Sequence, residues 1–195
     1  MKLRGLYAIT PEASDLERKV RLALEGGLAL LQYRSKAPDR AQAAAIVRMA
    51  HDYDVPVIVN DDVELALELD AAGAHLGRHD GDLRAARKRL GARILGASCY
   101  HQLERAHDAV QAGADYIAFG SVFASPTKPG AVRAPLALFR DAKALGVPLA
   151  AIGGITLENG PQLIAAGADL LAVITDLFDA PDIRARARAY GKLFV

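Results

Sequence analysis

Short apolar runs alternate with longer amphipathic segments along the 195 residues, and this alternation constrains the fold more than any other feature. The apolar runs are typical of buried strands. They cover residues 5–9, 28–33, 56–59, 74–76, 94–98, 116–119, 148–152 and 170–173. The segments between them carry charge on one side and Ala, Leu or Val at helical spacing on the other. We therefore expect helices at residues 16–25, 40–53, 63–69, 83–90, 102–112, 136–144, 159–166 and 182–190.

Strands that are apolar at nearly every position and separated by helices indicate parallel pairing with both faces of the sheet covered. Eight such cycles are the number that closes a (β/α)8 TIM barrel. A doubly wound open sheet is the alternative, but the first strand leads only into Thr10, Pro11 and Glu12, without a glycine fingerprint for a nucleotide. We predict an α/β fold with one single-domain (β/α)8 barrel over residues 1–195 and a site at the C-terminal rim of its strands.

Glycines recur between a helical segment and the next apolar run, at Gly73, Gly113 and Gly167. A glycine at this position supplies the left-handed residue that ends a helix. We expect these glycines to mark the N-terminal end of the barrel, where sequence serves stability more than chemistry.

Composition narrows the function classes. Hydrophobic residues make up 52% of the chain, which argues against disorder, and the net charge of +1 gives no general surface for nucleic acid or anionic membrane. Cys99 is the single cysteine, so no internal disulfide can form. The N-terminal apolar stretch is too short for a signal peptide, and no run reaches the ~20 residues of a membrane span. We expect a cytoplasmic protein with small-molecule partners, and a homo-oligomer is left open.

Polar residues or glycines follow each of the later strands on the C-terminal side, and in a parallel barrel they converge on one rim. The candidates are Gln32, Tyr33, Arg34, Ser35, Lys36, Asn60, Asp61, Asp80, Ser98, Ser125, Pro126, Thr127, Lys128, Gly153, Gly154, Ile174 and Thr175.

Four aspartates near the rim divide into two roles. Asp62 and Asp82 directly precede helical segments and are expected to be N-caps. Asp61 and Asp80 are then spare, and two carboxylates from neighbouring strand ends suit Mg²⁺ bound together with a substrate phosphate. Each acid taken singly is as compatible with a cap or a surface residue.

Cations and stiff loops complete the rim. Gln32, Arg34 and Lys36 alternate, so an extended chain would place all three on one face, where two cations call for an anion. A solvated strand end is the alternative. The prolines and hydroxyls at 125–130 and the glycine pair at 153–154 suit phosphate, which barrels often bind with the loops after strands seven and eight.

In their order and spacing, QYRSK (32–36), IVNDD (58–62), GAHLG followed by Asp80, PTK (126–128) and AIGGI (151–155) resemble the thiamine phosphate synthase family. The match covers almost the whole chain. The resemblance implies a (β/α)8 transferase that joins a pyrimidine methyl diphosphate to a thiazole phosphate, releasing pyrophosphate in a Mg²⁺-assisted, dissociative displacement.

The resemblance also implies residue roles. The diphosphate ligands would be Gln32, Arg34, Lys36, Asn60, Ser98 and Lys128, of which Arg34, Lys36, Ser98 and Lys128 act in catalysis; Tyr33 and Ser35 belong to the same segment. Asp61 and Asp80 would bind Mg²⁺. Ser125, Pro126, Thr127, Gly154, Ile174 and Thr175 would form the thiazole-phosphate pocket. Ser125, Thr175, Arg78 and the pair Cys99 and Tyr100 depart from the usual family residues.

Two other readings stay open at this point. A related barrel that tautomerises the thiazole phosphate needs the phosphate pocket but not the diphosphate cluster. A non-catalytic barrel would bind thiazole phosphate or thiamine phosphate without turnover.

Overall fold

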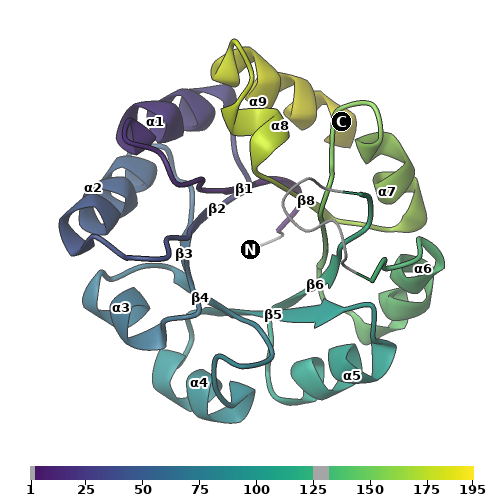
Figure 1. Ribbon diagram of the computed structural model, residues 1–195. Coiled ribbons are helices and arrows are strands. Elements are labelled where there is room, and N and C mark those ends of the chain that lie inside the picture. Colours follow the sequence, from purple (N-terminus) through teal and green to yellow (C-terminus); the bar gives the residue numbers. More distant parts are fainter. Residues whose placement is uncertain (1–2, 125–131) are drawn as a thin grey trace.

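Eight parallel strands close into one barrel in chain order, and the helices form a ring outside it (Figure 1). The structure is a computed structural model that describes residues 3–124 and 132–195. Pairing of β1 with β8 completes the closure, with Tyr7 opposite Ala172. The prediction of a (β/α)8 barrel is confirmed.

The strands are short and buried. They are β1 Gly5–Ile9, β2 Leu30–Tyr33, β3 Val57–Asn60, β4 Gly73–Leu76, β5 Ile94–Tyr100, β6 Tyr116–Gly120, β7 Leu149–Ile152 and β8 Leu170–Val173. The first and last have the predicted bounds, and the others differ by one or two residues at an end. The predicted C-terminal ends of the strands are therefore correct to within two residues.

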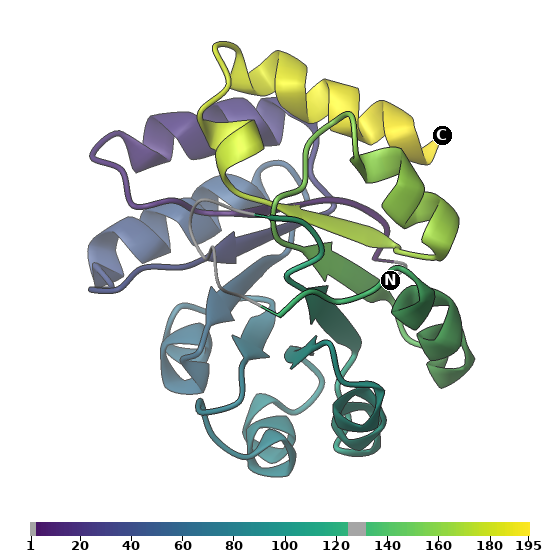
Figure 2. The ribbon, with the colours of Figure 1, turned by 45° about the vertical axis from the view of Figure 1, so that its right-hand side comes forward.

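The helices are α1 Leu16–Gly26, α2 Arg40–His51, α3 Val63–Glu68, α4 Leu83–Leu90, α5 Leu103–Gln111, α6 Ala137–Ala142, α7 Gly160–Ala166, α8 Thr175–Phe178 and α9 Ile183–Gly191, with short 3-10 turns η1 Lys143–Leu145 and η2 Lys192–Phe194. α9 lies along α1 and so covers the junction of the last and first strands (Figure 2). The short α8 was not predicted. In the described ranges, no helix has the length and apolar character that a membrane crossing requires.

Two of the four rim aspartates are helix caps, as predicted. The Asp62 carboxylate accepts from the backbone N–H of Leu65 at 2.8 Å, and the Asp82 carboxylate accepts from that of Ala85 at 2.8 Å. Such caps satisfy N–H groups that the first helical turn leaves unpaired. Asp61 and Asp80 are thus left for another role.

The N-terminal end of the barrel differs from the prediction at one glycine. Gly113 and Gly167 have φ values of +95° and +115° and end their helices as expected. Gly73 instead begins β4, and the left-handed residue after α3 is Asp70, with a φ of +52°. A Cβ at Gly73 would overlap the carbonyl oxygen of Ile94 on β5, so glycine is needed there for close strand approach.

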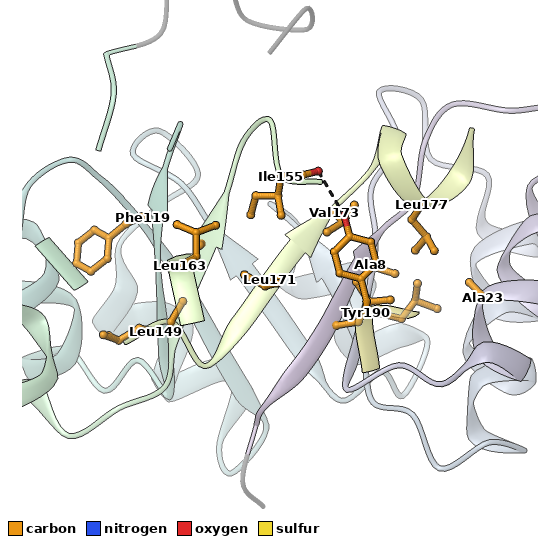
Figure 3. Close-up of a cluster of buried hydrophobic side chains, with 14 of the residues drawn as sticks. Ala8, Ala23, Phe119, Leu149, Ile155, Leu163, Leu171, Val173, Leu177 and Tyr190 are labelled. Carbon is orange, nitrogen blue, oxygen red and sulfur yellow. Dashed lines mark hydrogen bonds between the residues drawn. The ribbon is translucent and has the colours of Figure 1, made fainter. Parts of the chain in front are cut away.

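The core has two layers. The larger lies between the sheet and the helices, where side chains such as Phe119, Leu163 and Leu171 pack together (Figure 3). The smaller fills the barrel interior and includes Tyr7 and Tyr116. Each fully buried side chain of this size contributes about 1.5–3 kcal/mol. The interior layer also holds polar atoms, since the Tyr7 and Tyr116 hydroxyls lie 2.7 Å apart within it.

Candidate active site

Asp61 and Asp80 come together at the C-terminal rim, close enough for Asp80 to raise the pKa of the Asp61 carboxyl. Asp61 follows β3 in a left-handed conformation with a φ of +62°, and its backbone N–H donates to the carbonyl of His75 at 2.8 Å. Asp80 lies in the turn after β4, where its Oδ2 accepts from the N–H of Gly77 at 2.8 Å. The structure thus brings together the two acids that the sequence singled out.

The electrostatics of this pair favour a cation. Burial and the neighbouring Asp80 raise the pKa of Asp61 to about 6, although Asn60 and Arg34 act in the opposite direction. Asn60 Nδ2 donates to Asp61 Oδ2 at 2.6 Å. Two like charges this close hold a proton more tightly, and a divalent cation would relieve the same repulsion. The donor set therefore fits Mg²⁺, which prefers oxygen ligands.

Two carboxylates are a small ligand set. Within residues 3–124 and 132–195, no group of three or more His, Cys, Asp or Glu side chains is placed to hold a metal ion. Mg²⁺ is commonly bound by one or two carboxylates, with waters and substrate phosphate completing the shell. The pair therefore suits an ion that arrives with a phosphorylated substrate.

Arg34 and Lys36 follow β2 and are exposed at the rim. The loop after β1 fixes their backbone. Thr10 Oγ1 accepts from the N–H of Arg34 at 2.8 Å and donates to its carbonyl at 2.9 Å. A Glu12 carboxylate oxygen accepts from the N–H of Lys36 at 2.7 Å, and the other accepts from the Ser35 hydroxyl at 3.3 Å. Two cations are thus held on one short, anchored segment.

Sequence reasoning missed Thr10 and Glu12 as supports of this segment. Only the barrel topology could have indicated this role, because the loop after the first strand of a barrel adjoins the loop after the second. Thr10 is 1% exposed, so its hydroxyl serves Arg34 and not solvent.

Tyr33 does not join the rim cluster. Its side chain is buried in the outer core, and its hydroxyl lies 3.3 Å from both the backbone N–H and the carbonyl of Asp39. β2 also ends at Tyr33, so the strand alternation predicted for Gln32, Arg34 and Lys36 extends to neither Arg34 nor Lys36. Alternation along β2 turns Tyr33 toward the helices and Gln32 toward the barrel interior.

A continuous hydrogen-bond chain crosses the interior from Gln32 on β2 to Ser98 on β5. Gln32 Nε2 donates to the Tyr7 hydroxyl at 2.6 Å, which lies 2.7 Å from the Tyr116 hydroxyl. The Tyr116 hydroxyl is 2.8 Å from His75 Nδ1, and His75 Nε2 is 2.8 Å from Ser98 Oγ. The chain therefore links two of the predicted substrate ligands through three residues not assigned to the site.

Burial keeps this chain uncharged near neutral pH. It raises the pKa of Tyr7 and of Tyr116 and lowers the pKa of His75 to about 4, although Asp80 opposes the shift of His75. His75 is 6% exposed, in agreement with its prediction as an interior residue. The one sequence signal for Tyr7 and Tyr116 is a tyrosine, with its hydroxyl group, within an otherwise apolar strand.

A hollow with a volume of about 420 Å³ opens after β7 and β8. Gly154, Thr156, Thr175 and Arg186 are among the residues that line it. Gly154 has a φ of +64°, and its carbonyl accepts from Asn159 Nδ2 at 2.9 Å. Ile174 precedes α8 and packs against the interior layer. Asp176 and Asp179 also line it, and the Arg186 guanidinium is paired with the Asp176 carboxylate at 3.2 Å. The groups that suit a phosphate here are therefore the backbone amides and the hydroxyls of Thr156 and Thr175.

The sequence also singled out Cys99, Arg78 and residues 125–128. Cys99 is buried, which raises the pKa of its thiol to about 12 and leaves it unreactive. Arg78 stacks over the Tyr100 ring at 5.1 Å and donates to Gln102 at 2.8 Å. Ser125, Pro126, Thr127 and Lys128 lie outside the described residues.

Paired carboxylates, anchored cations and a polar hollow at the C-terminal mouth of a closed barrel define the class: a (β/α)8 enzyme for phosphorylated small molecules. A model of the family described as "Thiamine monophosphate synthase" matches residues 6–177.

Relatives and solved structures agree with this match. The chain is 59% identical over 202 aligned positions to a thiamine-phosphate synthase of Aromatoleum aromaticum, covering 99% of this chain and 97% of the relative. It is 50% identical to one of Methylobacillus flagellatus, covering 98% and 96%. The structure of a thiamine phosphate pyrophosphorylase from Pyrococcus furiosus superimposes with a TM-score of 0.87 at 32% identity, covering 99% and 96%. The chain belongs to the thiamine monophosphate synthase family, and its class of reaction is group transfer.

Proposed function

We propose that the rim joins a pyrimidine methyl diphosphate to a thiazole phosphate, giving thiamine phosphate and pyrophosphate. In this reaction the bond between the pyrimidine methylene carbon and the diphosphate oxygen breaks, and its electron pair leaves with pyrophosphate. The thiazole nitrogen then supplies the electron pair for the new carbon–nitrogen bond. The electron-rich aminopyrimidine can stabilise the intervening cation, so a dissociative path is expected.

Asp61 and Asp80 would hold Mg²⁺ between their carboxylates. The ion would neutralise charge that grows on the departing diphosphate. The contribution of the chain is to keep the two acids together, through the Asn60 contact to Asp61 and the Gly77 contact to Asp80.

Arg34, Lys36, Ser98 and Lys128 would donate to the diphosphate as negative charge develops on it. Stabilisation of this kind is electrostatic and needs no covalent enzyme intermediate. The support for Arg34 and Lys36 is their anchorage by Thr10 and Glu12, which spares the cost of ordering the segment during reaction. Lys128 rests on the sequence resemblance alone.

The hollow after β7 and β8 would hold the phosphate of the thiazole partner. Gly154 and Thr175 line it, and Ser125, Pro126, Thr127 and Ile174 stay with them as sequence predictions. Fixing the partner through its phosphate would orient the thiazole nitrogen toward the reacting carbon, which converts a bimolecular step into a local one.

The observation that carries the proposal is the proximity of Asp61 and Asp80 at the rim, where Asp80 raises the pKa of Asp61, because neither a phosphate pocket alone nor a tautomerase requires paired acids. The test is to mix both purified substrates with the protein and Mg²⁺ and to look for thiamine phosphate by chromatography. Formation of thiamine phosphate that stops when Mg²⁺ is chelated supports the proposal. Binding of thiazole phosphate without product would indicate the non-catalytic alternative, and isomerised thiazole phosphate would indicate the tautomerase. Cytoplasmic location and a homo-oligomeric state stay predictions.

A further inference from the structure

The interior chain of five side chains has a direction, because its first member can act in only one way. Gln32 meets the Tyr7 hydroxyl through Nε2, and an amide nitrogen donates but does not accept. The Tyr7 oxygen therefore accepts from Gln32. Its own proton must point to its other partner, the Tyr116 oxygen at 2.7 Å.

The same logic continues through the histidine. Tyr116 accepts from Tyr7, so its proton points to His75 Nδ1 at 2.8 Å, which must be the unprotonated ring nitrogen. A neutral imidazole then carries its proton on Nε2. Nε2–H donates to Ser98 Oγ at 2.8 Å. The orientation of one amide thus fixes the tautomer of a histidine on the other side of the barrel.

The last member is left with its proton free. Ser98 Oγ accepts from His75, and within the described residues it has no second hydrogen-bond partner. Ser98 is only partly buried, unlike the other four members of the chain. Its O–H is therefore available at the rim, on the strand next to the one that precedes Asp80.

We propose that this chain makes Ser98 an obligatory hydrogen-bond donor to the diphosphate, with Tyr7, Tyr116 and His75 as positioning residues. The inference rests on the proposed function, and it deepens that function by assigning a polarity to the site. Ionised diphosphate oxygens only accept hydrogen bonds. If the hydrogen bonds ran in the opposite direction, Ser98 would donate its proton to His75. Its oxygen lone pairs would then face the anionic diphosphate, which they would repel.

The kinetic test is a double-mutant cycle between Ser98→Ala and Tyr116→Phe. Ser98→Ala removes the donor and should lower kcat about a hundredfold. Tyr116→Phe keeps the ring and should lower kcat on the order of tenfold, as expected for a residue that orients a ligand group. Because Tyr116 acts through Ser98, the double variant should be no slower than Ser98→Ala. Losses that multiply would overturn the proposal.

Phe119→Leu is the matched control for core damage. Phe119 lies on β6 with Tyr116 but packs outward against Phe139, so its loss perturbs the same strand without touching the chain. It should leave the effect of Ser98→Ala unchanged. If Tyr116→Phe does not fold, Tyr7→Phe takes its place in the cycle, because it cuts the chain one link earlier.

A substrate-free measurement tests the direction itself. In ¹H–¹⁵N long-range spectra of the wild-type protein, the His75 signals are those that disappear in His75→Gln. We expect an unprotonated Nδ1 and a protonated Nε2, and the reverse tautomer would overturn the proposal.

Calorimetry with inorganic pyrophosphate adds a binding readout, in which Ser98→Ala and Tyr116→Phe should both weaken binding. If the wild type makes no thiamine phosphate, the proposed function is wrong. The His75 tautomer still shows, independently of turnover, whether the hydrogen-bond chain runs from Gln32 to Ser98.

Discussion

Asp61 and Asp80 reach each other from the ends of neighbouring strands, and neither is used as a helix cap. Their neighbours Asp62 and Asp82 take that role instead. Of the adjacent residues Asp61 and Asp62, the second caps a helix and the first faces the rim. The proposed Mg²⁺ site and the proposed reaction both depend on the pair Asp61 and Asp80.

Mg²⁺ should raise the melting temperature of the protein at pH 7.5. The raised pKa of Asp61, about 6, means that the metal-free folded state binds a proton more tightly than the unfolded chain does. This bound proton stabilises the folded state fully below about pH 3.8, the pKa of Asp61 in the unfolded chain. The stabilisation is lost as the pH rises through 6, the pKa of Asp61 in the folded state. The cation replaces that proton, so the shift should shrink toward pH 5. Thermal scans with and without Mg²⁺ measure it.

Asp62→Asn is the matched control for this experiment, because asparagine also caps helices and the neighbouring charge is removed. It should keep the Mg²⁺ response, whereas Asp61→Asn should lose most of it. An equal response in Asp61→Asn and the wild type would place the ion elsewhere.

Thr10→Val should destabilise the protein and raise KM for the diphosphate substrate. The Thr10 hydroxyl pairs with both backbone groups of Arg34, and valine leaves them unpaired at a buried position, at a cost of about 1–3 kcal/mol. Urea unfolding and steady-state kinetics measure the two effects. Thr10→Ser keeps the hydroxyl and should stay near the wild type. A valine variant as good as the serine variant would show that Arg34 needs no such support.

Gly154→Ala should weaken binding of thiazole phosphate. Gly154 is left-handed, and an added Cβ would overlap the Ala124 carbonyl, so the loop must move. Gly146→Ala is a close control, since Gly146 has a φ of +74° and open space around its Cβ position. Both variants bear the left-handed cost of about 1–2 kcal/mol, but only Gly154→Ala should reduce affinity in calorimetry. Equal affinities in the two variants would remove this loop from the pocket.

The wild type should lose stability as pH falls from 6.5 to 4 more steeply than His75→Gln does. Burial lowers the pKa of His75 to about 4, so between these values the unfolded chain binds a proton that the folded state does not. The contribution of His75 is therefore full above pH 6.5 and falls as pH drops, by up to roughly 3 kcal/mol. Urea unfolding at several pH values gives the slopes, and parallel slopes would mean that His75 titrates normally.

Much of the fold could be predicted because its signals are local. The strand Leu170–Val173 is a continuous apolar run that begins directly after Asp169, and its bounds were predicted correctly. The helix Thr175–Phe178 was missed because four residues are too few to show a helical period. Gly73 was misassigned because a glycine for close strand approach and a glycine for a helix cap look alike in sequence.

The proximity of site residues was predictable where they follow neighbouring strands and unpredictable where the partners come from across the barrel. Asp61 and Asp80 follow strands that the pattern placed, so their meeting could be expected. Tyr7 and Tyr116 are 109 residues apart, and no local pattern indicates that their hydroxyls touch. Tyr33 was wrongly grouped with Gln32 because a sequence cluster does not show which side chains turn toward the helices.

The most direct test of the account is turnover of purified Asp61→Ala and Asp80→Ala beside Asp62→Asn, with folding checked by circular dichroism. The account predicts that each of the two alanine variants stays folded and forms thiamine phosphate at least about a hundredfold more slowly than the wild type, while Asp62→Asn stays close to it. Turnover within a few-fold of the wild type in either alanine variant would contradict the claim that this acidic pair drives the reaction.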